Sequence, residues 1–79
     1  MTITEVRNHS EYAIAFAKIR KYREGFTFTL NYTAIPTPQA NALKIIMRDA
    51  VKAGLIECVE TGFTLDGTIT DETYRRTGI

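Results

Sequence analysis

The side chains whose types and spacing could do chemistry lie on one expected helix, residues 37–53. One amide, three cations and one aliphatic group recur there at helical spacing and fall on one side of a helical wheel. They are Asn41, Lys44, Ile45, Arg48 and Lys52. Lysine and arginine can neutralise phosphates or reach guanine, asparagine can read adenine, and an aliphatic group can meet a thymine methyl. The pattern indicates either a solvated helix face or a recognition helix that contacts nucleic acid.

The opposite side of this expected helix is apolar and is predicted to face the core. Its members are Ala40, Leu43, Ile46, Met47, Ala50 and Val51. Burial of Leu43, Ile46 and Met47 should contribute ~1.5 to 3 kcal/mol each. The helix should therefore be held in one orientation, with its cationic side presented outward.

A second set of cations lies earlier in the chain, on and just after an expected first helix. Lys18, Arg20, Lys21 and Arg23 are candidates for phosphate contacts. Residues 18–52 carry seven cations against two acids, whereas residues 53–79 carry two cations against five acids. A basic middle and an acidic end suit an acidic partner, either DNA or a protein.

Catalytic and metal chemistry is not indicated. The single histidine, His9, stands at the start of the first expected helix, and the single cysteine, Cys58, lies in an expected apolar strand and should belong to the core. No set of metal ligands and no glycine-rich phosphate loop is evident in the sequence. We expect no enzyme, no cofactor and no bound metal.

The length and composition indicate an ordinary globular chain. The 79 residues form one expected domain, residues 1–79, with 44% hydrophobic and 24% charged residues. No apolar run approaches the length of a membrane span, and the N-terminus lacks a secretory pattern. With one unpaired cysteine, we expect a cytoplasmic protein that does not contact membranes.

The periodicity of the chain predicts an α+β fold with two helices packed on a short, mostly antiparallel sheet. We expect strands at 2–6, 26–32, 55–59 and 63–65, helices at 9–22 and 37–53, a turn at 61–62, a last helical turn after residue 70, and a frayed end at 75–79. Asn8 and Glu11 have the spacing of a capping box. Thr37 is the expected N-cap of the second helix and Gly54 its left-handed C-cap.

The stretch "DAVKAGLIECVETGFTL", residues 49–65, resembles the end of the recognition helix and the wing of winged helix-turn-helix regulators of the MarR and ArsR type. The resemblance covers residues 37–65. Core and cap positions of that pattern are matched by Ile46, Ala50, Gly54, Leu55 and Ile56, and groove-facing positions by Asn41, Lys44, Ile45 and Arg48. Residues 26–36, where the family has a short second helix, read here as a strand.

Two functions are consistent with these patterns. The resemblance implies a small winged-helix-like, DNA-binding transcription regulator. The alternative is a βαβαββ sandwich that binds an acidic protein, as an adaptor or as a compact inhibitor of the kind that phages encode against host machinery. Ile14 and Ile45 both fall off the core faces of their helices, as an exposed protein-binding surface would require. A free strand edge would also allow a homodimer.

Overall fold

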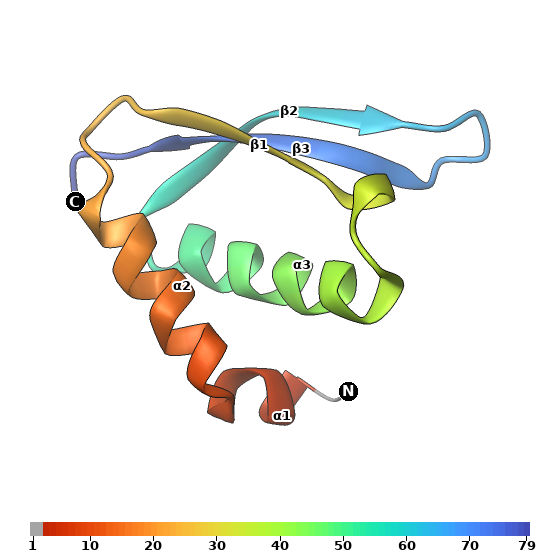
Figure 1. Ribbon diagram of the computed structural model, residues 1–79. Helices are drawn as coiled ribbons and strands as arrows, with labels where there is room; N and C mark the ends of the chain where they lie inside the picture. The colour runs from red at the N-terminus through yellow and green to blue at the C-terminus, as the bar shows by residue number, and fades with distance from the viewer. Residues whose placement is uncertain (1–2) are drawn as a thin grey trace.

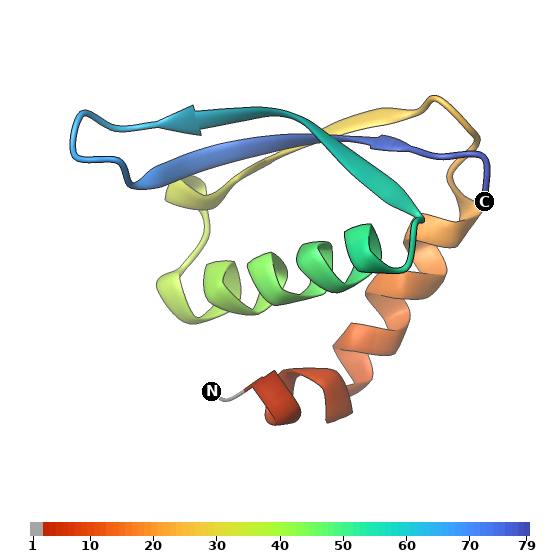
Figure 2. The same ribbon diagram turned by 180° about the vertical axis from the view of Figure 1, so that it is seen from behind.

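The computed structural model describes residues 3–79 as two layers, an antiparallel sheet and the helices that pack on one of its faces (Figure 1). The chain forms helix α1 (Ile3–Asn8), helix α2 (Ser10–Lys21), strand β1 (Thr27–Asn31), the 3-10 helix η1 (Tyr32–Ala34), helix α3 (Thr37–Lys52), strand β2 (Ile56–Phe63) and strand β3 (Ile69–Arg76). The expected α+β class is confirmed. Seen from behind, α3 runs beneath the sheet and the β2–β3 hairpin extends past the helices (Figure 2).

The last strand of the chain is the centre of the sheet. The strand order is β1-β3-β2, and both outer strands run antiparallel to β3. Thr27 lies opposite Arg75 and Asn31 opposite Asp71, so β1 pairs along its whole length. The pairing of β2 shifts register between Cys58 and Glu60 and again after Gly62. Bulges of this kind bend a strand and re-aim its side chains.

The strand expected over residues 2–6 is wrong, because residues 3–8 form α1; Thr2 lies outside the described residues. The local alternation of β-branched residues is overridden by packing, since Val6 is buried in the core and Arg7 binds Asp49 of α3. The element order within residues 3–79 therefore begins with a helix, not with the strand of a βαβαββ arrangement.

The capping box expected at Asn8 is also wrong, because α1 runs through that residue. His9 is the N-cap of α2, and its Nδ1 accepts a hydrogen bond of 3.2 Å from the backbone N–H of Glu11. A histidine expected to stand beside the cap is the cap itself.

Residues 26–36 contain both a strand and a helical turn. After β1, the side chain of Asn31 accepts hydrogen bonds from the backbone and the hydroxyl of Thr33 and so starts η1. This turn removes Tyr32 from the expected strand and buries its ring. No helix longer than η1 separates β1 from α3.

Helix α3, Thr37–Lys52, matches the expected range 37–53 to within one residue, but its N-terminal cap differs from the expected one. Thr37 is already helical, Pro36 occupies the N-cap position without a side-chain hydrogen bond, and Pro38 lies in the first turn. Gly54 adopts φ +78°, a conformation that favours glycine, and reverses the chain into β2. The expected Thr37 cap is wrong, and the Gly54 cap is confirmed.

The hairpin is longer than expected, and the sheet formed by residues 3–79 has three strands, not four. Strand β2 continues through the expected turn at 61–62, and the residues expected to return as a strand, 63–65, lead into the true turn. Asp66 accepts hydrogen bonds from the hydroxyl of Thr64 and the backbone of Thr68, and Gly67 has φ +86°. These bonds close the loop and lower the pKa of Asp66, the Thr64 hydroxyl most strongly.

The expected helical turn after residue 70 is wrong, and the expected frayed end at 75–79 is wrong for residues 75–76, whereas residues 77–79 lie outside regular structure. Residues 69–76 form β3, which pairs on both sides. A segment paired on both edges has its backbone hydrogen bonds satisfied and no reason to fray.

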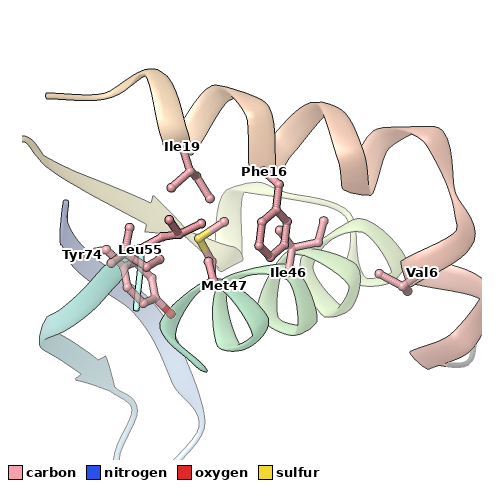
Figure 3. Packing of buried hydrophobic residues seen from close by; sticks show 9 residues of the cluster. Val6, Phe16, Ile19, Ile46, Met47, Leu55 and Tyr74 are labelled. Carbon is pink, nitrogen blue, oxygen red and sulfur yellow. The ribbon is translucent and has the colours of Figure 1, made fainter. Parts of the chain in front are cut away.

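The core lies between the sheet and the inner sides of the helices (Figure 3). It consists of Val6, Phe16, Ile19, Ile46, Met47, Ala50, Leu55, Ile56 and Tyr74. Three of these residues come from α3, and the others reach it from α1, α2, the α3–β2 turn, β2 and β3. Helix α3 is therefore fixed on its apolar side by the rest of the described chain.

One charged residue, Arg76, is buried at the edge of this core. Its Nε donates to the carbonyl of Ile19 at 3.0 Å, and its Nη1 donates to the carbonyls of Leu55 and Thr77 at 3.0 and 2.9 Å. Ile19 lies in the last turn of α2, where the negative end of the helix dipole favours a cation. The guanidinium therefore ties the end of α2 to the turn between α3 and β2.

We expect Arg76→Met to lower the free energy of unfolding by about 3 kcal/mol, because the charge-assisted hydrogen bonds from the buried guanidinium to the carbonyls of Ile19 and Leu55 are lost. Each of these carbonyls keeps one backbone donor, the N–H of Tyr22 and the N–H of Thr77 respectively. Urea denaturation followed by circular dichroism measures this difference. The matched control is Arg75→Met, one residue earlier, where an exposed pair with Glu57 is lost and the change should stay under about 1 kcal/mol. An equal loss of unfolding free energy at the two positions would contradict the role of Arg76 in joining α2 to the α3–β2 turn.

Candidate functional site

The outer side of α3 presents a polar and cationic surface. Asn41, Arg48 and Lys52 are exposed. They lie on the side of the helix opposite the buried Met47 and Ala50. Within residues 3–79 neither Arg48 nor Lys52 forms an ion pair with a carboxylate. Two of the three predicted cations of this helix are therefore open to solvent and form no ion pair within the described residues.

Lys44 belongs to the same predicted stripe but is turned toward η1. It is half-buried, and its Nζ lies 5.0 Å from the centre of the Tyr32 ring, a cation–π distance. The Tyr32 hydroxyl donates to Oε1 of Glu72 at 3.0 Å. Burial, more than the neighbouring carboxylate of Glu72, raises the pKa of Tyr32 and keeps this donor protonated. Lys44 thus shares its surroundings with an acid and is less available than Arg48.

Ile45 is not part of the exposed surface. It is half-buried and packs against the core cluster, so its expected place on an open stripe is wrong. Asp49, one turn further along the same side of α3, is bound by Arg7 of α1. The packing of α1 against this side explains the difference, because a helical wheel contains no information about neighbouring elements.

A bidentate ion pair fixes α3 against the other two helices. Nε and Nη2 of Arg7 donate to the two carboxylate oxygens of Asp49 at 2.8 and 2.9 Å, and the Tyr12 hydroxyl donates to Asp49 at 2.7 Å. The hydrogen bonds from Arg7, more than that from Tyr12, hold the pKa of Asp49 at about 2. Asp49 is thereby engaged internally by Arg7 and Tyr12, and Lys52, one turn further along α3, also interacts with it electrostatically.

The predicted phosphate-contacting set is exposed but does not form one surface. Lys18, Arg20, Lys21 and Arg23 are all open to solvent. Lys18 and Arg20 differ by two residues and so lie on nearly opposite sides of α2. Lys18 lines a hollow beside β1, whereas the guanidinium of Arg20 stands 5.6 Å from the Phe16 ring. These cations cannot all face the same ligand.

The β2–β3 hairpin carries apolar groups and no cation before Arg75. Val59, Phe63 and Leu65 are exposed along it. The sequence predicts all three on one hairpin, but the expected turn at 61–62 is wrong, because β2 continues to Phe63 and Leu65 lies in the loop that joins β2 to β3.

Cys58 was expected in the core and is exposed, so that prediction is wrong. It lies in β2 next to the first register shift, with its Sγ 3.4 Å from Oγ1 of Thr61 and 3.8 Å from a carboxylate oxygen of Glu72. No cluster of three or more histidine, cysteine, aspartate or glutamate residues in the described part of the chain could hold a metal ion. No helix within residues 3–79 is both long and apolar enough to cross a membrane.

We expect Asp49→Asn to lower the free energy of unfolding at pH 7 by roughly 1 to 2 kcal/mol, because half-exposed Arg7 loses its charged acceptor. The native pKa of about 2 lies below the ordinary value of 3.8, so this stabilisation is complete above pH 4 and is lost as the pH falls through 2. Urea unfolding of both proteins at pH 7, 4 and 2.5 measures it. A difference that does not shrink with falling pH would contradict the role of the carboxylate.

Known proteins do not identify this arrangement. No protein-family model, no curated protein and no solved structure matches the chain. Its function is therefore argued from the geometry of α3 and the elements around it.

Proposed function

We propose that the protein binds nucleic acid through the outer side of α3, as a small winged-helix-like regulator in the cytoplasm. The observation that carries the proposal is the exposed surface formed by Asn41, Arg48 and Lys52, on a helix whose opposite side is buried. A recognition helix must be rigid, solvent-exposed and cationic on one side, because its side chains have to reach base edges and phosphates together.

The order of elements supports this proposal. Helix α3 ends at a glycine and leads into a strand, a turn and a returning strand, as the resemblance over residues 37–65 implies. The 3-10 turn η1 stands where the family has its second helix. The β2–β3 hairpin is not suited to phosphate binding, because it has Asp66 at its turn and no cation before Arg75. We therefore assign DNA binding to α3.

The three exposed residues have distinct expected roles. Arg48 can donate two parallel hydrogen bonds to guanine, and Asn41 can form a bidentate pair with adenine. Lys52, near the end of α3, suits a phosphate. Lys44 can add a phosphate contact where its chain leaves the Tyr32 ring, whereas Ile45 is engaged in packing and is not assigned to a base.

We expect duplex DNA binding to weaken with salt. Phosphate contacts from Lys44 and Lys52 predict a slope of about −2 for log K against log salt concentration, and a further phosphate contact from Arg48 would bring it to about −3. Arg48→Ala should reduce the magnitude of this slope by about 1 if the guanidinium meets a phosphate, and should weaken binding about tenfold or more if it meets guanine. Fluorescence anisotropy with a labelled duplex, titrated between low and moderate salt, measures both.

The matched control for this experiment is Arg75→Ala. It removes the same charge from β3, where Arg75 is paired with Glu57. Its affinity and slope should equal those of the unaltered chain. A binding constant that does not change with salt, or an equal loss at both positions, would reject the proposal.

A second candidate, a protein-binding adaptor or inhibitor, is favoured by the exposed apolar groups of the hairpin. Phe63 is 62% exposed and Leu65 is fully exposed, as expected of side chains that a protein partner covers. Phe63→Ser with Leu65→Ser should abolish such binding and leave the salt slope for DNA unchanged. A stoichiometric protein partner lost in this variant, without any DNA binding at low salt, would replace the first proposal by the second.

A further inference from the structure

An open apolar groove runs along one side of α2. Two hollows, of about 480 and 320 Å³, lie along α2. The larger faces α1 and the first half of α3, and the smaller faces β1 and α3. Glu11, Leu43 and Ile46 line both hollows, so the two adjoin. The short η1 turn between β1 and α3 leaves this space without a helix of the chain's own.

The side of α2 that borders the groove carries three different groups in line. Glu11, Ile14 and Lys18 are spaced by three and four residues and so share one side of the helix. Ile14 is 57% exposed, although it stands beside the apolar lining. Within residues 3–79, neither Glu11 nor Lys18 forms an ion pair.

The charges on this side of α2 are complementary to those of a second α2 helix that runs antiparallel to it. The acid precedes the central isoleucine and the base follows it, so a second α2 lying antiparallel would place its Lys18 opposite Glu11 and its Glu11 opposite Lys18. A two-fold axis near Ile14 and Ala15 generates both ion pairs at once. Like charges would instead meet in a parallel arrangement.

We propose that the groove is the binding site for the α2 helix of a second copy of this chain, in an antiparallel, two-fold symmetric homodimer. Ile14 of each copy enters the partner's groove beside Leu30 and Leu43, where burial of an exposed aliphatic group is favourable. The two Glu11–Lys18 pairs at the ends select the antiparallel orientation.

The dimer leaves the outer side of α3 free. Leu43 and Ile46, which form the floor of the groove, are on the buried side of that helix, away from Asn41 and Arg48. A helix of 12 residues is roughly 18 Å long, so the contact is small and association should be weak and concentration-dependent.

Sedimentation equilibrium over a concentration series at low salt tests the proposal. The apparent mass of the unaltered chain should rise from 8.9 kDa toward twice that value as concentration increases. Ile14→Asp should abolish the rise. Glu11→Lys and Lys18→Glu should each weaken association at least tenfold, because the two-fold axis doubles every unfavourable contact.

The decisive variant is the double exchange Glu11→Lys with Lys18→Glu, which restores opposite charges across the axis. It should recover association to within a few-fold of the unaltered chain. Arg20→Glu is the matched control, since it makes the same charge change as Lys18→Glu on nearly the opposite side of α2 and should leave association unchanged. Circular dichroism verifies that each variant is folded.

A mass that stays at 8.9 kDa at every concentration would overturn the proposal. A folded double variant that fails to recover association would overturn it as well, and would assign any dimer to another surface. The outcome is separable from DNA binding, because Glu11→Lys leaves Asn41, Arg48 and Lys52 in place and the salt slope can be measured on the monomeric variant.

Discussion

The packing of α3 beneath the sheet is the constraint on which the rest of the structure depends. Ala50 is 0% exposed, so α3 approaches its neighbours as closely as a methyl group allows. A larger side chain there would push the helix away and open the whole layer. Because Ile46 and Met47 are buried on the same side, the helix cannot rotate without exposing them. The direction in which Arg48 points is therefore decided by the core and not by any ligand.

Helical periodicity was a reliable guide to the two longer helices, since the spacing of apolar residues in α2 and α3 is repeated over several turns. It also placed Asn41, Arg48 and Lys52 on the outer side. The strands were harder, because residues 2–6 alternate as a strand would, yet they fold as a helix that buries Val6. A short alternating pattern does not indicate whether a partner strand is available for pairing. In the described chain no strand pairs with residues 3–6.

The remaining errors concern contacts between residues far apart in sequence. Arg7 and Asp49 are separated by 42 positions, and no local pattern marks them as a pair. Ile45 is partly buried because it packs against the core cluster, on the side of α3 that faces α1. Lys44 lies over an aromatic ring because η1 places Tyr32 beside it. The burial of Arg76 was equally difficult to predict from the sequence, since its acceptors are backbone carbonyls, which every residue type carries.

The central position of β3 affects the order in which the fold can be made. The chain leaves the ribosome from its N-terminus, so β1 and β2 are complete before the strand that joins them exists. Phe28 of β1 cannot pair until Tyr74, the residue opposite it in β3, has been synthesised. Contacts of such long range slow folding, because a large loop has to close before any of them form. During synthesis the helices can form early, but the sheet is assembled only after the last strand has emerged.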